Sequence, residues 1–153
     1  MSATQWWGSR QAWFLVPLRL MLGFGFAAHG YAKLMRGPEN LASTLQALGV
    51  PAPHLMSWVT TLIELVGGVM VMAGAFVVPL SVPLIVVMLT AMFTVHLRYG
   101  FSTIKLISAN ASGAKFGPPG YEMNLLYIVG LVTLVLGGPG AFSVDGYRRK
   151  ARG

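Results

Sequence analysis

Residues 55–78 read LMSWVTTLIELVGGVMVMAGAFVV, an apolar stretch that is interrupted by a single charged residue, Glu64. About 20 consecutive apolar residues are enough for a helix to cross the hydrocarbon core of a bilayer. Pro51 and Pro53 lie just before the stretch and separate it from any preceding helix. The stretch therefore predicts a transmembrane helix.

Three further apolar stretches flank this one. Together they predict an all-α membrane protein, a four-transmembrane-helix bundle in one domain over residues 1–153, with spans at about 13–34, 55–78, 80–97 and 121–138 and a basic tail at 146–153. Pro79 and Pro83 predict a tight hairpin over residues 77–83, because the second and third spans would otherwise form one implausibly long helix. A polar loop over residues 98–121 precedes the fourth span, and we expect its apolar patch 104–107 at the membrane interface.

The composition excludes several classes of protein. Hydrophobic residues make up 55% of the chain and charged residues only 10%, whereas soluble domains carry about 25% charged residues. The formal net charge is +7, but the basic residues concentrate in the tail, so we expect contact with membrane lipid and not with nucleic acid. The chain has no cysteine, which excludes disulfides, thiol redox chemistry and iron–sulfur clusters.

The charged residues outside the spans bear on orientation. Four spans place both termini on one side of the membrane, together with Arg10 and the basic residues of the tail. The opposite side carries as many basic residues, namely Lys33, Arg36, Arg98, Lys105 and Lys115. The count is a tie, and the density of the tail favours cytoplasmic termini in the cytoplasmic membrane. We expect the first helix to be retained, because Arg19 interrupts the apolar core that a cleavable signal peptide needs.

Ionisable residues inside the spans are the candidates for function. A charge in hydrocarbon costs at least about 2.5 kcal/mol, so such residues usually face the interior of a helix bundle. Arg19, His29 and Lys33 form one stripe along the first helix, and Glu64 shares a face of the second helix with Gly67 and Gly68. We predict an interior polar cluster that binds a ligand, formed by His29, Lys33, Glu64, His96, Glu122, Arg19 and Tyr127.

These residues also have structural interpretations. Arg19 and Lys33 are long enough to extend their charges to the headgroup layers, and His96 suits a structural or interfacial role. Glu64 can pair with His29, Lys33 or Arg19 to fix helix assembly, or it can take part in ligand binding or proton transfer. We predict no metal site, since no His-x-x-x-His or Glu-x-x-His pair lies on one helix.

A set of short motifs runs from Arg19 to Asp145. It comprises Arg19, Gly23 and Gly30-Tyr31-Ala32-Lys33, then Gly49-Val50-Pro51-Ala52-Pro53, Glu64-Leu65-Val66-Gly67-Gly68, Gly74, Ala91 and His96, Glu122-Met123-Asn124-Leu125-Leu126-Tyr127, and Gly138-Pro139-Gly140-Ala141-Phe142-Ser143-Val144-Asp145. In this order and spacing the motifs resemble those of the DoxX family of small membrane proteins. The resemblance implies a four-helix membrane fold.

The resemblance also implies a link to quinones, since the family is named after a subunit of a membrane enzyme that passes electrons to quinone. Our leading hypothesis is a quinone-associated subunit of a membrane redox or oxidative-stress system, with quinone as the candidate ligand. Lys33 or His29 would hydrogen-bond a quinone carbonyl, Glu64 or Glu122 would exchange the proton, and Phe26 and Tyr127 would pack on the ring. The candidate partners are a membrane or peripheral redox protein and a second copy of the chain.

Two alternatives stay open. In a scaffolding subunit, the same residues would form interhelical pairs and carry no chemistry of their own. In a small-molecule transporter, they would line a path, although four spans without an evident inverted repeat disfavour transport unless the protein oligomerises. The sequence leaves open whether the chain is itself catalytic.

Overall fold

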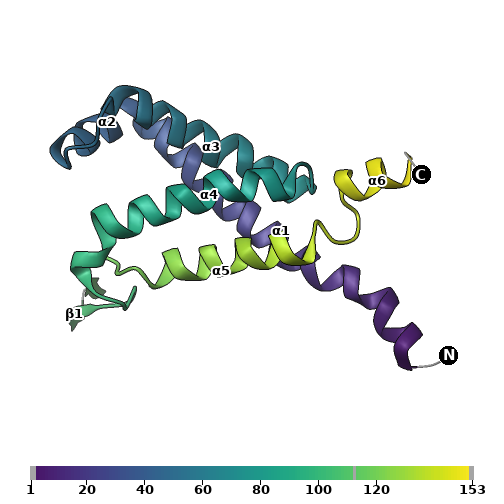
Figure 1. Cartoon of the computed structure of the whole chain (residues 1–153). Helices are drawn as coiled ribbons and strands as arrows, with labels where there is room; N and C mark the ends of the chain where they lie inside the picture. The colour runs from purple at the N-terminus through teal and green to yellow at the C-terminus, as the bar shows by residue number, and fades with distance from the viewer. Residues whose placement is uncertain (1–2, 112, 152–153) are drawn as a thin grey trace.

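The computed structural model describes residues 3–111 and 113–151. Four helices form the bundle, namely α1 (Ala3–Arg36), α3 (Pro53–Ala73), α4 (Val77–Ala91) and α5 (Glu122–Gly137) (Figure 1). A short helix, α2 (Pro38–Ala47), joins α1 to α3, and α6 (Val144–Lys150) follows α5. The two ends of the chain lie at the same end of the bundle (Figure 1).

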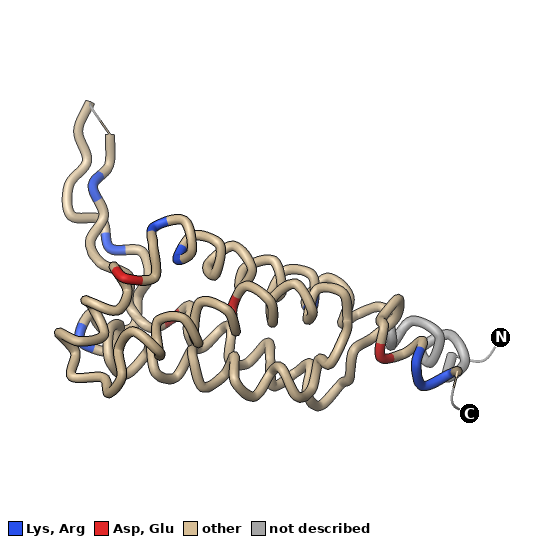
Figure 2. The backbone as a smooth tube through the Cα atoms, turned by 90° about the horizontal axis from the view of Figure 1, so that it is seen from above, with Lys and Arg blue, Asp and Glu red and all other residues tan. Residues whose placement is uncertain are grey.

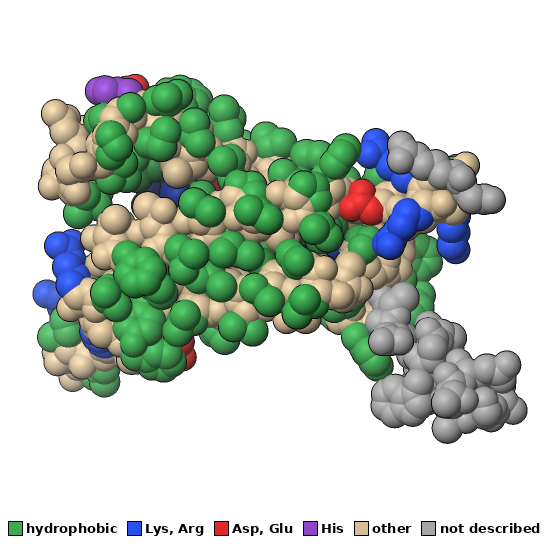
Figure 3. Space-filling view, in the orientation of Figure 1, with side chains coloured by type: hydrophobic (Ala, Val, Ile, Leu, Met, Phe, Trp, Pro, Cys, Tyr) green, Lys and Arg blue, Asp and Glu red, His purple; other side chains and the backbone are tan. Residues whose placement is uncertain are grey.

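Three of the four predicted spans are long and apolar enough to cross a membrane, namely residues 13–36 of α1, the whole of α3, and the helical segment 77–99. Their outer faces carry hydrophobic side chains, and charged side chains gather near the two ends of the molecule (Figure 3). This chain is a membrane protein. The fourth helix, α5, has 16 residues and a length of about 24 Å, less than the hydrocarbon core of about 30 Å. The count of four spans therefore stays a prediction.

The turn between α3 and α4 is not where the prolines predicted it, and the hairpin over residues 77–83 is wrong. The chain turns at Gly74, Ala75 and Phe76, and Gly74 and Phe76 adopt left-handed φ angles of 70° and 52°. Pro79 is the third residue of α4, a position whose backbone N–H has no partner within a helix. Pro83 lies inside α4 and does not end it.

The chain is mostly helical, as predicted, with an exception in the loop before α5. The predicted polar loop contains an antiparallel hairpin of β1 (Leu106–Asn110) and β2 (Gly113–Phe116), which projects away from the bundle (Figure 2). Before it, α4 continues through a π-helical turn, η1 (Met92–His96), and a 3-10 turn, η2 (Leu97–Tyr99). Both strands are exposed along their length, and contact of residues 104–107 with the membrane interface stays a prediction.

Glycines bring α1 and α3 into close contact. A Cβ atom at Gly68 would lie 2.4 Å from the backbone nitrogen of Ala27, and one at Gly30 would lie 2.4 Å from that of Leu65. Such small-residue contacts are typical of helix packing in membranes. Beside them, the buried apolar core joins α1, α3, α4 and α5 through Leu22, Phe26, Val71, Val77, Leu84, Leu131 and Leu134.

The neighbouring Gly67 and Gly68 offer a matched test of this contact. Gly68→Ala should destabilise the protein by about 1–3 kcal/mol, since the added methyl group meets the backbone of α1 and the helices must separate. Gly67→Ala should be tolerated, because a Cβ there lies at an ordinary 3.7 Å from the Leu84 side chain. Unfolding by sodium dodecyl sulfate in mild detergent measures both. Equal loss in the two variants would contradict the assignment of the close contact to Gly68.

Candidate functional site

A cavity of about 480 Å³ lies between α1, α3, α4, η1 and the start of α5. The molecule is hollowed there, at the end away from the termini (Figure 3). Five of the seven predicted site residues line this cavity, and the other residues of its wall are mainly apolar. The full lining is His29, Lys33, Leu41, Glu64, Met88, Ala91, Val95, His96, Pro119, Gly120, Met123, Asn124 and Tyr127.

An ion pair crosses from α1 to α3 in the wall of the cavity. Lys33 Nζ lies 2.5 Å from Glu64 Oε2; the Glu64 side chain is 3% exposed and the Lys33 side chain 29%. Among the described residues, no hydrogen bond reaches this buried oxygen besides the contact from Lys33. Of the three cations that the sequence left as partners for Glu64, the structure therefore selects Lys33. The carboxylate depends on that single ammonium group.

Aromatic residues of α1 and α5 form the next part of the wall. The Tyr127 ring packs edge-on against Phe26 at 5.0 Å and lies 6.4 Å from the His29 ring. The Tyr127 hydroxyl group reaches α1 at Gly25, where a Cβ atom would lie only 1.9 Å away. Phe26 itself is fully buried in the core and does not line the cavity. Phe26 is therefore not placed to contact a ligand in this cavity, and the contact of Tyr127 with a ligand ring stays a prediction.

His96 is held in the cavity wall by the π-helical turn η1. Its Nδ1 atom lies 3.1 Å from the carbonyl oxygen of Pro119. A carbonyl oxygen can only accept, so Nδ1 donates the hydrogen bond and, in the neutral ring, Nε2 is left as an acceptor. Single π-helical turns within α-helices occur frequently at functional sites, because they redirect side chains.

Sequence reasoning did not select Asn124, which also lines the cavity. Its side-chain amide donates to the Met88 carbonyl oxygen at 3.3 Å and so links α5 to α4. The signal was present, since Asn124 precedes Tyr127 by three residues and shares its helical face. Uncharged polar side chains inside apolar helices are therefore candidates for a functional site, as ionisable side chains are.

Two predicted site residues lie outside the cavity. The Glu122 carboxylate accepts a hydrogen bond from the backbone nitrogen of Thr103 at 3.0 Å and so holds the loop that precedes the β-hairpin. Arg19 lies on α1 about 21 Å from Lys33 along the axis, and its guanidinium group bonds to carbonyl oxygens of Pro139, Ala141 and Phe142. Helical periodicity predicts that Arg19 shares a face of α1 with Lys33. It does not show that the two side chains lie at opposite ends of the bundle.

No three histidine, aspartate or glutamate side chains lie close enough together to hold a metal ion in residues 3–111 and 113–151. Glu39 pairs with His54 instead, at 2.7 Å on the exposed surface where α2 meets α3. The polar groups in the cavity wall are an ammonium–carboxylate pair, two imidazoles, a phenol and an amide. These groups can bind a polar head and exchange protons.

Comparison with known proteins assigns the family. Residues 14–97, which carry His29, Lys33, Glu64 and His96, match the DoxX family. The chain belongs to the DoxX family. It is similar to an uncharacterized membrane protein of Mycobacterium tuberculosis, with 26% identity over 86% of this chain and 78% of the relative.

A second relative of this DoxX protein is an uncharacterized protein of Haemophilus influenzae, with 30% identity over 87% of this chain and 89% of the relative. No solved structure matches the chain. The family assignment therefore agrees with the membrane fold, and the chemistry has to be argued from the cavity itself.

Proposed function

We propose that this DoxX protein is a quinone-associated subunit of a membrane redox system, and that its cavity holds the quinone head group. The observation that carries the proposal is the Lys33–Glu64 pair in the wall of a mainly apolar cavity. A charged pair is costly inside a membrane protein and usually marks a functional site. Ligand sites of about 300–1,000 Å³ commonly combine apolar walls with a few polar groups, as this cavity does.

The lining groups match the chemistry of a quinone. The two carbonyl oxygens of a quinone accept hydrogen bonds, and the cavity presents the Lys33 ammonium group, the His29 imidazole and the Tyr127 phenol as donors. Glu64 is an acid that can exchange a proton with the bound ring. The apolar side chains of Met88, Ala91 and Val95 suit the face of the ring and the start of its isoprenoid tail. The ligand would enter from the bilayer, where quinones reside.

Reduction of a quinone to a quinol takes two electrons and two protons. The chain has no cysteine, so we assign the electrons to a partner redox protein in or at the membrane. In this proposal the Lys33 ammonium group gives one proton to a quinone oxygen. The Glu64 carboxylate takes up the second proton from water and passes it to the ligand, and the partner supplies the two electrons. A second copy of the chain is a further candidate partner.

We also propose that both termini are cytoplasmic. Supporting this orientation, the two ends of the chain lie at one end of the bundle (Figure 2), and α6 there carries Arg148, Arg149 and Lys150. Basic residues are enriched on the cytoplasmic side of membrane proteins. The cavity would then open near the opposite surface.

Quinone binding tests the proposed function. Protein purified in mild detergent should contain quinone on lipid extraction and mass spectrometry, and it should bind an added short-chain ubiquinone. His29→Gln should weaken that binding by at least about tenfold, since a polar contact to the ligand is lost. His54→Gln is the matched control, because His54 lies on the exposed surface and pairs with Glu39. Absence of quinone and of binding in the wild-type protein would refute the proposal.

A scaffolding role is the second candidate, and the ion pair between α1 and α3 favours it directly. The double exchange Lys33→Glu with Glu64→Lys separates the two functions. In a scaffold, the exchanged pair restores stability and assembly with membrane partners. In a quinone site, the exchange restores stability but leaves short-chain ubiquinone binding impaired, because donor and acid have changed helices.

A further inference from the structure

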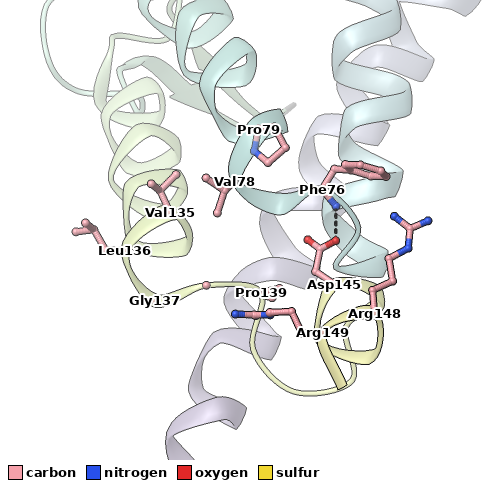
Figure 4. Close-up of a pocket in the computed structure, with 11 residues that line it drawn as sticks. Phe76, Val78, Pro79, Val135, Leu136, Gly137, Pro139, Asp145, Arg148 and Arg149 are labelled. Carbon is pink, nitrogen blue, oxygen red and sulfur yellow. Dashed lines mark hydrogen bonds between the residues drawn. The ribbon is translucent and has the colours of Figure 1, made fainter. Parts of the chain in front are cut away.

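A second cavity, of about 640 Å³, lies at the other end of the bundle. It opens between the first turn of α4, the last turn of α5 and helix α6 (Figure 4). One side of it is apolar and includes Val78, Val135 and Leu136, whereas the other side carries Asp145, Arg148 and Arg149 (Figure 4). None of these residues belongs to the cavity that holds the Lys33–Glu64 pair.

This second cavity, an open groove, carries a net positive charge from Arg148, Arg149 and Asp145. The Asp145 carboxylate is engaged, because it accepts hydrogen bonds from the backbone nitrogens of Phe76 and Val77 at 2.9 and 3.0 Å. The Arg148 guanidinium group lies 5.0 Å from the centre of the Phe76 ring. Among the described residues, the Arg149 side chain makes no hydrogen bond or ion pair. The Arg148 side chain extends toward the Phe76 ring and the Arg149 side chain toward Pro139, on either side of Asp145 (Figure 4). Arg149 is thus the cation that lies beside the apolar wall without a carboxylate partner among the described residues.

The position of the groove along the bundle matches the boundary between hydrocarbon and headgroups. Val78 is the second residue of α4, and Leu136 is the penultimate residue of α5. Both apolar helices therefore end at this level, and the arginines of α6 stand just beyond them. Leu136 is 83% exposed and Val78 is 43% exposed, so the apolar wall is open to a hydrocarbon chain.

We propose that this groove binds one anionic phospholipid, with its phosphate group at Arg149 and an acyl chain along Val78, Val135 and Leu136. Charge complementarity selects an anionic head group, and the exposed apolar wall selects a lipid over a free anion. Basic pockets between membrane helices bind acidic headgroups in this manner. Occupancy would join α4, α5 and α6 through one ligand and fix the C-terminal helix on the membrane surface.

Native mass spectrometry of the full chain in mild detergent tests the proposal. Dioleoyl phosphatidylglycerol should bind as one tight copy, and dioleoyl phosphatidylcholine, which has the same chains and no net charge, should bind at least fivefold more weakly. Arg149→Gln should reduce phosphatidylglycerol affinity about fivefold, the usual effect of one basic residue at an anionic surface. Arg149→Gln removes no contact within the described structure, so loss of folding is not expected to confuse the result.

Lys150→Gln is the matched control, since it removes the same charge from α6 but does not line the groove. It should leave the affinity unchanged. An equal loss in Lys150→Gln and Arg149→Gln would overturn the proposal in favour of diffuse attraction between the tail and the bilayer. Competition by glycerol phosphate, the head group without chains, at equal concentration would overturn it in favour of a simple anion site.

Discussion

Lys33→Met should lower the free energy of unfolding by about 3–5 kcal/mol, the usual cost of removing one partner from a buried ion pair. The physical reason is the position of Glu64, whose side chain is 3% exposed and whose Oε2 atom has only the Lys33 ammonium group as a partner among the described residues. Without Lys33 the carboxylate is left without compensation in an apolar surrounding. Unfolding by sodium dodecyl sulfate, followed by circular dichroism in mild detergent, measures the loss.

The two halves of the pair should not be equivalent. Glu64→Gln should cost less, about 1–2 kcal/mol, because the Lys33 side chain is 29% exposed and can extend toward water at the mouth of the cavity. The double variant Lys33→Met with Glu64→Gln should recover most of the stability, since a neutral pair leaves no buried charge. Equal losses in both single variants, with no recovery in the double variant, would rule out a buried carboxylate as the cause.

Much of the cavity could be predicted from the sequence because the physics is local and strong. A charge in hydrocarbon has to face the bundle interior, and helical periodicity then places His29 and Lys33 on one stripe of α1. In the structure Lys33 meets Glu64 of α3, and His29 lies beside Tyr127 of α5. Glu64 follows from the same argument on α3. The structure brings these three residues together with His96 and Tyr127 in one cavity, whereas their role in binding a ligand stays a prediction.

Depth and loop geometry could not be predicted in the same way. Periodicity repeats every turn, so it cannot separate Arg19 from Lys33, although about four helical turns lie between them. Glu122 is at the start of α5, where its bond to the Thr103 backbone depends on how the preceding loop folds back. Such a contact between distant positions has no counterpart in sequence spacing.

The turn and the strands were missed for related reasons. Pro79 by itself predicts a break in the helix, yet a proline in the first turn of a helix removes no helical hydrogen bond. The turn at Gly74 is held instead by Asp145, which is far away in sequence and bonds to Phe76 and Val77. The β-hairpin has exposed strands of five and four residues, so neither burial nor length distinguished it from a loop.

Arg19 should have a structural role of similar size to that of the ion pair. Arg19 is 2% exposed. Its guanidinium group donates hydrogen bonds to the carbonyl oxygens of Pro139, Ala141 and Phe142. The segment that presents these carbonyls is bent, since Gly138, Gly140 and Phe142 have φ angles of 81°, 72° and 47°. Phe142 is the one non-glycine residue of these three, and its left-handed φ costs about 1–2 kcal/mol. The hydrogen bond from Arg19 to the Phe142 carbonyl oxygen helps to offset that cost.

Arg19→Met should therefore cost at least about 3 kcal/mol, because three carbonyl groups lose their partner at once. It should also release the segment 138–150, including α6, which hydrogen exchange by mass spectrometry would record as faster exchange confined to that segment. Arg19→Lys is the matched control: it keeps the charge but lacks the planar fork that reaches separate carbonyls, so it should be intermediate. If Arg19→Met kept both its stability and its slow exchange, the carbonyl contacts would not be what holds the C-terminal segment on α1, and the charge at Arg19 would need another explanation.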